Sequence, residues 1–191
     1  MVTPMSRYVA FLRAINVGGR TVKMQRLCTL FELMGLSNVE TFIASGNVIF
    51  ETTARSSVAL EKTIADRLRT ALGYDVGTFI RSVAEVSAIA RYQPFPSKDL
   101  EAKGSTLYVA FLANTISRTA ERTLLTFRTK VDEFRLHGSE IYWLCRVRSS
   151  ESEFSLALLE KELGVQATFR NSTTVRKIAA RYDASARQRG G

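Results

Sequence analysis

The chain has 191 residues, which is enough for one large domain or two small ones. It is 46% hydrophobic and 24% charged, as ordinary globular proteins are, and no apolar run approaches the roughly 20 residues of a membrane-spanning helix. Lys and Arg outnumber Asp and Glu by 27 to 18, which gives a formal net charge of +9. Such a charge favours anionic partners, or it serves solubility alone.

Cysteine usage and the N-terminal segment indicate a cytoplasmic location. The two cysteines, Cys28 and Cys145, are far apart in the sequence. Free thiols in a reducing compartment are therefore favoured over a single disulfide. The N-terminal segment has no charged region before its apolar stretch, so no secretory signal peptide is expected.

Strand and helix patterns alternate through the first half of the chain. β-Branched and aromatic residues favour strands, and apolar residues three and four positions apart favour helices. Ser45 and Gly46 predict a short turn between two strands, because glycine takes a positive φ without strain. Ser82 and Glu85 form a capping box, which marks a helix start. In chain order, we predict a strand at 7–15, a helix from Met24 to Gly35, strands at 39–44 and 47–51, a helix from Leu60 to Gly73, a strand at 75–81 and a helix from Ser82 to Tyr92.

The second half repeats this order. The pentapeptide YVAFL occurs at residues 8–12 and again at 108–112, and Gly46 and Gly73 have counterparts in Gly138 and Gly164. These matches occur in the same order along both halves, so we interpret them as an internal duplication. The predicted elements are a strand at 105–112, a helix from Ile116 to Phe127, strands at 131–136 and 140–144, a helix from Leu156 to Leu163, a strand at 166–170 and a helix from Ser172 to Tyr182.

Each half has the order β-α-β-β-α-β, which is typical of the ferredoxin-like plait. We therefore predict an α+β protein of two tandem ferredoxin-like plaits, each followed by an extra helix. Both alternating residue sets of YVAFL are apolar, so the two halves should cover one another in one compact body. The segment 93–104 contains two prolines and is the expected linker. The expected domains are 1–95 and 96–191, the second with a basic C-terminal tail.

The loop after the first strand is the first candidate binding site. Asn16, Gly18 and Gly19 precede a predicted helix, and paired glycines let backbone N–H groups approach an anion at a helix start. Arg13 ends the preceding strand and would add positive charge. The alternative is a tight turn that requires glycine only for its φ angle. The sequence matches neither a P-loop nor a dinucleotide-binding fingerprint.

The segment Arg170–Lys177 is the second candidate site. Its charged, amide and hydroxyl side chains precede and begin the last predicted helix, where a phosphate or carboxylate would be stabilised. The alternative is a capped helix start with a solvated basic face. We expect this segment and the Asn16–Gly19 loop to form one anion-binding cleft. The residues of this second site are Arg170, Asn171, Thr174 and Lys177.

Other polar motifs are weaker candidates. The Ser45–Asn47 turn can present the polar side chains of Ser45 and Asn47, but a purely structural turn is the simpler interpretation. His137 is the one histidine of the chain, so a histidine-activated nucleophile or a zinc cluster is not expected. The loop 146–152 either holds an anion or has no binding role. We expect no cofactor and no metal, and no enzyme class is indicated.

Three motifs together resemble the bacterial domain-of-unknown-function family 1697. They are YVAFLRAINVGG, TFIASGNVIFE and TFRNSTTVRKIAA, and the similarity extends from Arg7 to about Tyr182. The resemblance implies tandem α-β plaits and no established reaction. It singles out Arg13, Asn16, Val17, Gly18, Gly19, Ser45, Gly46, Asn47, Arg170, Asn171, Thr174, Val175 and Lys177. Ala14 departs from the family pattern, which has glycine there, and Ser172 stands where an aromatic residue is usual.

Three hypotheses follow for the function. The first is a non-catalytic protein that binds an anionic ligand, either a nucleotide-like small molecule or nucleic acid. The second is an enzyme of unknown reaction that uses arginine and asparagine side chains. The third is a structural or oligomeric interaction protein. No membrane partner is expected.

Overall fold

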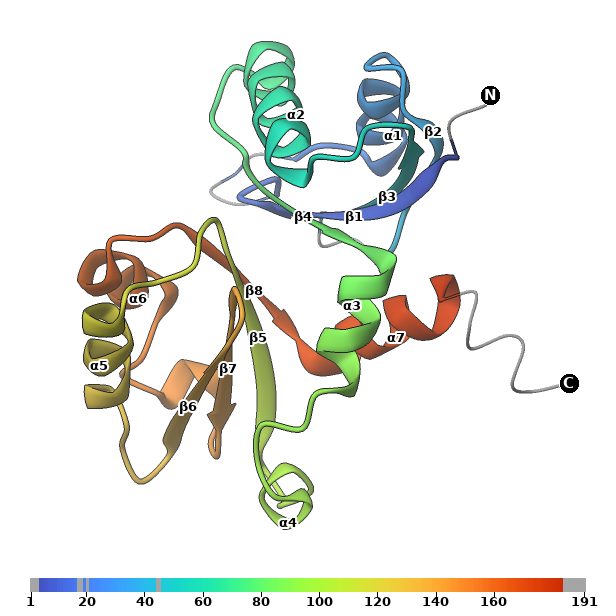
Figure 1. Cartoon of the computed structure of the whole chain (residues 1–191). Helices are drawn as coiled ribbons and strands as arrows, with labels where there is room; N and C mark the ends of the chain where they lie inside the picture. Colours follow the sequence, from blue (N-terminus) through green and yellow to red (C-terminus); the bar gives the residue numbers. More distant parts are fainter. Residues whose placement is uncertain (1–3, 17–18, 20, 44–45, 184–191) are drawn as a thin grey trace, which may run out of the picture. The chain divides into compact units, whose positions relative to one another are not determined.

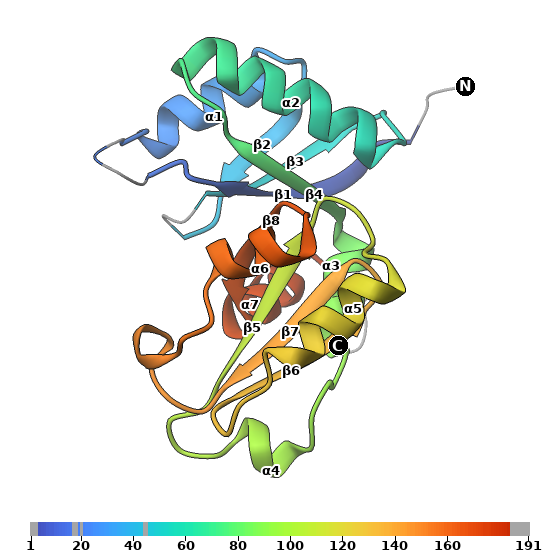
Figure 2. The same cartoon turned by 90° about the vertical axis from the view of Figure 1, so that its left-hand side faces the viewer.

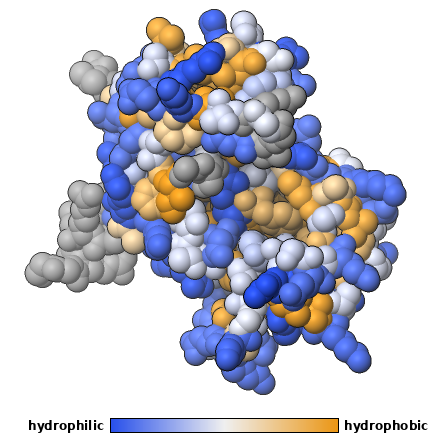
Figure 3. All heavy atoms as spheres, turned by 180° about the vertical axis from the view of Figure 1, so that it is seen from behind, coloured by the Kyte–Doolittle hydropathy of each residue, from blue (hydrophilic) through white to orange (hydrophobic). Residues whose placement is uncertain are grey.

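The structure is a computed structural model that describes residues 4–16, 19, 21–43 and 46–183. The chain divides into two units (Figure 1). Unit 1 comprises residues 1–88 together with 178–191, and unit 2 comprises residues 89–177. None of the described helices is long and apolar enough to cross a membrane. Hydrophilic residues cover most of the face drawn in Figure 3, with smaller hydrophobic patches between them.

Unit 1 contains a four-stranded antiparallel sheet with the strand order β2-β3-β1-β4. Helices α1 and α2 lie on one face of this sheet (Figures 1 and 2). The elements are β1 (Ser6–Arg13), α1 (Met24–Glu32), β2 (Ser37–Thr41), β3 (Asn47–Thr52), α2 (Ser57–Leu72), β4 (Gly77–Ser82) and the beginning of α3 (Val83–Arg91).

The core of unit 1 forms between the sheet and these two helices. Alternate residues of β1 contribute Ala10 and Leu12, while α1 contributes Phe31 and α2 contributes Ile64, all of them buried. Burial of each large apolar side chain stabilises the fold by about 1.5–3 kcal/mol. The other alternating set of β1 is also buried, since Val9 is fully shielded from solvent.

Unit 2 contains a second four-stranded antiparallel sheet, with the order β6-β7-β5-β8. Helices α5 and α6 lie on one face of it (Figures 1 and 2). Trp143 and Phe154 pack at a centroid distance of 5.0 Å in its core. The elements are the end of α3, α4 (Ser97–Leu100), β5 (Thr106–Leu112), α5 (Arg118–Thr126), β6 (Asp132–His137), β7 (Glu140–Cys145), the 3-10 helix η1 (Ser149–Glu151), α6 (Leu156–Leu163), β8 (Ala167–Asn171) and the beginning of α7 (Ser172–Tyr182).

The predicted α+β class and the order of strands and helices are confirmed. Several element ends differ from the sequence expectation. The predicted strand at 39–44 is β2 at Ser37–Thr41, and Ile43 beyond its end has a positive φ of 57°. The predicted linker at 93–104 contains the short helix α4. The domain boundaries at 95 and 96, the mutual covering of the halves and the internal duplication stay predictions.

Ala14 has a backbone conformation that glycine adopts without strain. Ala14 has a φ of +62°, in the left-handed region where a Cβ atom costs about 1–2 kcal/mol. Glycine removes this strain but makes the unfolded chain more flexible. We therefore expect Ala14→Gly to raise the free energy of unfolding by about 0.5–1 kcal/mol, measured by urea denaturation. An unchanged or lower value would contradict this account.

Candidate functional site

Described residues before and after the 17–20 segment make hydrogen bonds at the end of β1. The Oδ1 atom of Asn16 accepts a hydrogen bond from the Val22 N–H at 2.7 Å, and Val22 is buried. The Tyr74 hydroxyl donates to the Ile15 carbonyl at 3.3 Å. Gly19 has a φ of +79° with open space around the position of a Cβ atom. The structure thus gives Asn16 a role in shaping the loop, and Gly19 takes the conformation of a turn glycine.

Arg13, Gly46 and Asn47 lie at the same end of the unit 1 sheet. Arg13 is half-buried and pairs with Gly77 across β1 and β4. Asn47 is fully buried, and its Nδ2 donates to the Phe42 carbonyl at 2.9 Å. Asn47 therefore holds the hairpin together and offers no edge to solvent. Gly18 and Ser45 lie outside the described residues.

Arg170 is a buried arginine on β8. Its Nη1 donates to Thr168 Oγ1 at 2.9 Å and to the Phe169 carbonyl at 2.8 Å. Burial lowers the pKa of Arg170 to about 10, so the side chain stays charged at neutral pH. Because Thr168 precedes Arg170 on the strand, these hydrogen bonds turn the guanidinium back along β8. This direction could not be predicted from the sequence.

A second buried arginine, Arg81, occupies the corresponding position in unit 1. Arg81 pairs with Val9 across the sheet, as Arg170 pairs with Val109. The Arg81 guanidinium lies 3.7 Å from Glu61 Oε1, and burial raises the pKa of that Glu61 carboxyl. Sequence reasoning missed Arg81. The sequence does contain a signal that the two arginines correspond: a Thr-Phe pair stands directly before Arg170, and one residue before Arg81.

Three other predicted site residues gather at the start of α7. Asn171 is exposed, and its Oδ1 accepts from the Thr173 N–H at 2.8 Å. Thr174 is half-buried and Lys177 is exposed, one turn further along. The first turn of α7 contains no acidic residue. The Asn16–Gly19 loop belongs to unit 1 and the start of α7 to unit 2, so a cleft shared by both stays a prediction.

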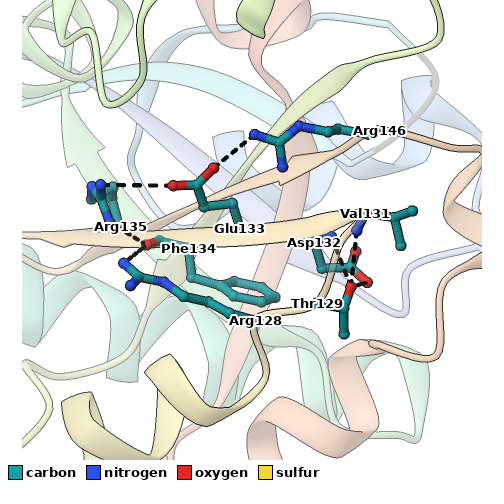
Figure 4. A network of polar contacts seen from close by, with 8 residues as sticks. All are labelled: Arg128, Thr129, Val131, Asp132, Glu133, Phe134, Arg135 and Arg146. Atoms are coloured by element: carbon teal, nitrogen blue, oxygen red, sulfur yellow. Dashed lines mark hydrogen bonds and ion pairs between the residues drawn. The ribbon is translucent and has the colours of Figure 1, made fainter.

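A polar network follows β6 in unit 2 (Figure 4). Arg146 forms an ion pair with Glu133 at 2.7 Å. The fully buried Asp132 accepts hydrogen bonds from Trp143 Nε1 at 2.8 Å and from Ser152 Oγ at 2.9 Å. These contacts fix both ends of the 146–152 loop. They favour a structural role for this loop over anion binding.

The surroundings of His137 and of the two cysteines favour structural roles for these side chains. The rings of His137 and Tyr92 stack at 4.0 Å. Both cysteines are free, and burial raises the pKa of the Cys28 and Cys145 thiols, which lowers their reactivity at neutral pH. Within the described ranges, no group of three or more His, Cys, Asp and Glu side chains is placed to hold a metal ion.

Comparisons with known proteins identify a family and a fold. The chain is similar to a solved structure, that of the conserved bacterial protein SP0830 from Streptococcus pneumoniae, at 21% sequence identity and a TM-score of 0.72. The similarity covers 94% of this chain and 99% of that chain. No curated protein matches the sequence. The profile of the family described as "Protein of unknown function (DUF1697)" matches residues 5–142, so the chain belongs to the DUF1697 family.

Proposed function

We propose that this protein binds an anionic, phosphate-bearing ligand at the start of α7. Asn171, Thr174 and Lys177 would contact the ligand, while Arg170 adds positive charge from the strand beneath without direct contact. The observation that carries this proposal is the difference between the starts of α7 and α3.

The start of α3 is neutralised by its own carboxylate. Glu85 Oε2 accepts from the Ser82 N–H at 2.7 Å, and Ser82 Oγ accepts from the Glu85 N–H at 3.2 Å. This is the capping box expected from the sequence, and it satisfies two backbone donors. An external anion would therefore meet a negative charge at this helix start.

The start of α7 lacks this internal anion. Asn171 pairs with Tyr108 as Ser82 pairs with Tyr8, so Asn171 and Ser82 occupy the same sheet position. Three residues further on, α7 has Thr174 where α3 has Glu85. The partial positive charge of a helix start stabilises an anion by about 0.3–1 kcal/mol. A charge-assisted hydrogen bond adds about 1.5–3 kcal/mol.

The proposal is tested by thermal unfolding of the whole protein in the presence of phosphate, pyrophosphate and a nucleoside triphosphate. A ligand that binds only the folded state raises the Tm with its concentration. Lys177→Gln should reduce the phosphate-dependent shift several-fold without changing the Tm of the ligand-free protein. Lys161→Gln is the matched control, because Lys161 is an exposed lysine on α6. If none of the three anions raises the Tm, or if both variants respond as the wild type does, the proposal is wrong.

The finer fold assignment is also a proposal. We infer that both units are ferredoxin-like plaits and arose by duplication. The support is the shared order β-α-β-β-α-β and the equivalent strand orders β2-β3-β1-β4 and β6-β7-β5-β8, antiparallel throughout. The predicted cytoplasmic location also stays a prediction.

A further inference from the structure

Unit 1 contains a cavity of about 350 Å³ beside α2. It lies between the segment that follows α1 and the first two turns of α2. The buried side chains of Leu36, Leu60 and Ile64 line its apolar floor. The volume falls within the range of small-molecule sites, roughly 300–1,000 Å³. Neither the cavity nor its lining residues belong to the proposed anion site in unit 2.

The rim of the cavity is polar and positively charged. Arg55, Ser56 and Thr63 line it, and Arg55 is exposed. The first turn of α2 contains no acidic residue. A negative group at this rim would therefore meet the guanidinium of Arg55 without a competing carboxylate from that turn.

Internal hydrogen bonds hold the β3–α2 segment that shapes the cavity. The Tyr8 hydroxyl donates to the Ala54 carbonyl at 3.2 Å, and the Ala54 N–H donates to Thr52 Oγ1 at 3.2 Å. Ser56 Oγ accepts from the Ala59 N–H at 3.2 Å and caps α2. The cavity is thus formed before any ligand enters, and binding requires little reorganisation.

Two large apolar side chains are exposed at residues adjacent in sequence to the lining. Leu33 is 79% exposed and precedes the lining residue Met34, while Val58 is 73% exposed and precedes the lining residue Ala59. Neither side chain lines the cavity, and single exposed apolar residues are common on protein surfaces, so the ligand of this cavity is inferred from the lining residues alone.

We propose that this cavity binds a small amphipathic carboxylate. The hydrocarbon chain lies against Leu36, Leu60 and Ile64, and the carboxylate lies at the rim beside Arg55. A water molecule takes roughly 30 Å³ in the liquid, and with the same volume for each non-hydrogen atom of a ligand, the cavity of about 350 Å³ holds about twelve. A straight-chain acid of about eight carbons therefore fits.

The test uses the full chain and sodium octanoate, with binding followed by calorimetry and by the Tm. Octanoate should bind and raise the Tm, while acetate and 1-octanol, which each lack one half of the ligand, should bind at least tenfold more weakly. Arg55→Gln should weaken octanoate binding about tenfold, and Ala59→Phe, which places a ring at the mouth from an exposed helix position, should abolish it. Lys62→Gln is the control, because Lys62 is on the same helix but does not line the cavity.

Each outcome decides the proposal. Absence of octanoate binding overturns it, as does equal binding of octanoate and 1-octanol or wild-type affinity in both Arg55→Gln and Ala59→Phe. Lys177→Gln should leave octanoate binding unchanged, and Arg55→Gln should leave the phosphate response unchanged. Failure of this proposal is therefore distinguishable from failure of the phosphate site at α7.

Discussion

Replacement of Gly46 by alanine is expected to lower the free energy of unfolding by about 2–5 kcal/mol. Gly46 has a φ of +72°, and a Cβ atom would lie 2.8 Å from Ile15 Cγ2 and 3.2 Å from the Leu12 carbonyl oxygen. The left-handed backbone costs about 1–2 kcal/mol for alanine, and the overlap with buried atoms adds about 1–3 kcal/mol. The Gly46 carbonyl also accepts from the Leu12 N–H at 2.8 Å, so a shift of the turn would disturb β1.

Gly138 provides a matched control for this prediction. It occupies the corresponding hairpin of unit 2 with a φ of +63°, but the nearest atom to its Cβ position is Glu140 Oε2 at 3.4 Å, the end of a side chain. Gly138→Ala should therefore cost only the backbone term of about 1–2 kcal/mol. Urea denaturation of both variants measures the difference. Equal destabilisation would show that the close packing at Gly46 is unimportant.

The strand and helix order could be predicted because it depends on local patterns. Runs of apolar, β-branched and aromatic residues mark β1 and β5, and glycines mark the ends of α2 and α6, where Gly73 and Gly164 take positive φ angles. Such signals lie within a few residues of the feature that they predict. Element ends were less predictable: the positive φ of Ile43 is not a property of the isoleucine side chain and arises from the surrounding structure.

The roles of the candidate site residues were less predictable, since they depend on distant partners. One interpretation of the sequence is that Asn47 presents a polar edge, but this side chain is buried and donates to the Phe42 carbonyl. Arg170 was expected at the start of α7, whereas its guanidinium turns toward Thr168. In an exposed turn or helix start, several directions of a long side chain are compatible with the same sequence. Packing in three dimensions selects one of them.

The buried carboxylate of Asp132 is the clearest example of a role that sequence reasoning missed. Its partners Trp143 and Ser152 are 11 and 20 residues away, and only the pairing of β6 with β7 and the course of the 146–152 loop bring them to it. Thr129 Oγ1 also donates a hydrogen bond to Asp132 Oδ2, at 3.1 Å. A buried carboxylate without partners would be strongly disfavoured, so these hydrogen bonds are a condition for the local fold.

Asp132→Ala is expected to lower the free energy of unfolding by about 3–5 kcal/mol. The substitution removes hydrogen bonds to a charged acceptor and leaves the Trp143 N–H without its partner, at a cost of about 1–3 kcal/mol for each such group. Asp132→Asn keeps the shape and one acceptor oxygen, so a smaller loss of about 1–2 kcal/mol is expected. Trp143 is the one tryptophan of the chain, and its fluorescence during urea denaturation reports directly on this region.

Glu133, the residue after Asp132, forms a surface ion pair, and its substitution can be compared with that of the buried Asp132. Glu133 pairs with Arg146 at 2.7 Å, but both side chains are about one-third exposed, at 28% and 30%. Solvent screens such a pair, so Glu133→Gln should cost no more than about 1 kcal/mol. If Glu133→Gln destabilised the protein as much as Asp132→Ala, charge on β6 rather than the buried hydrogen bonds would hold the 146–152 loop. The expected order is therefore Asp132→Ala, then Asp132→Asn, then Glu133→Gln, because each step removes less buried hydrogen bonding.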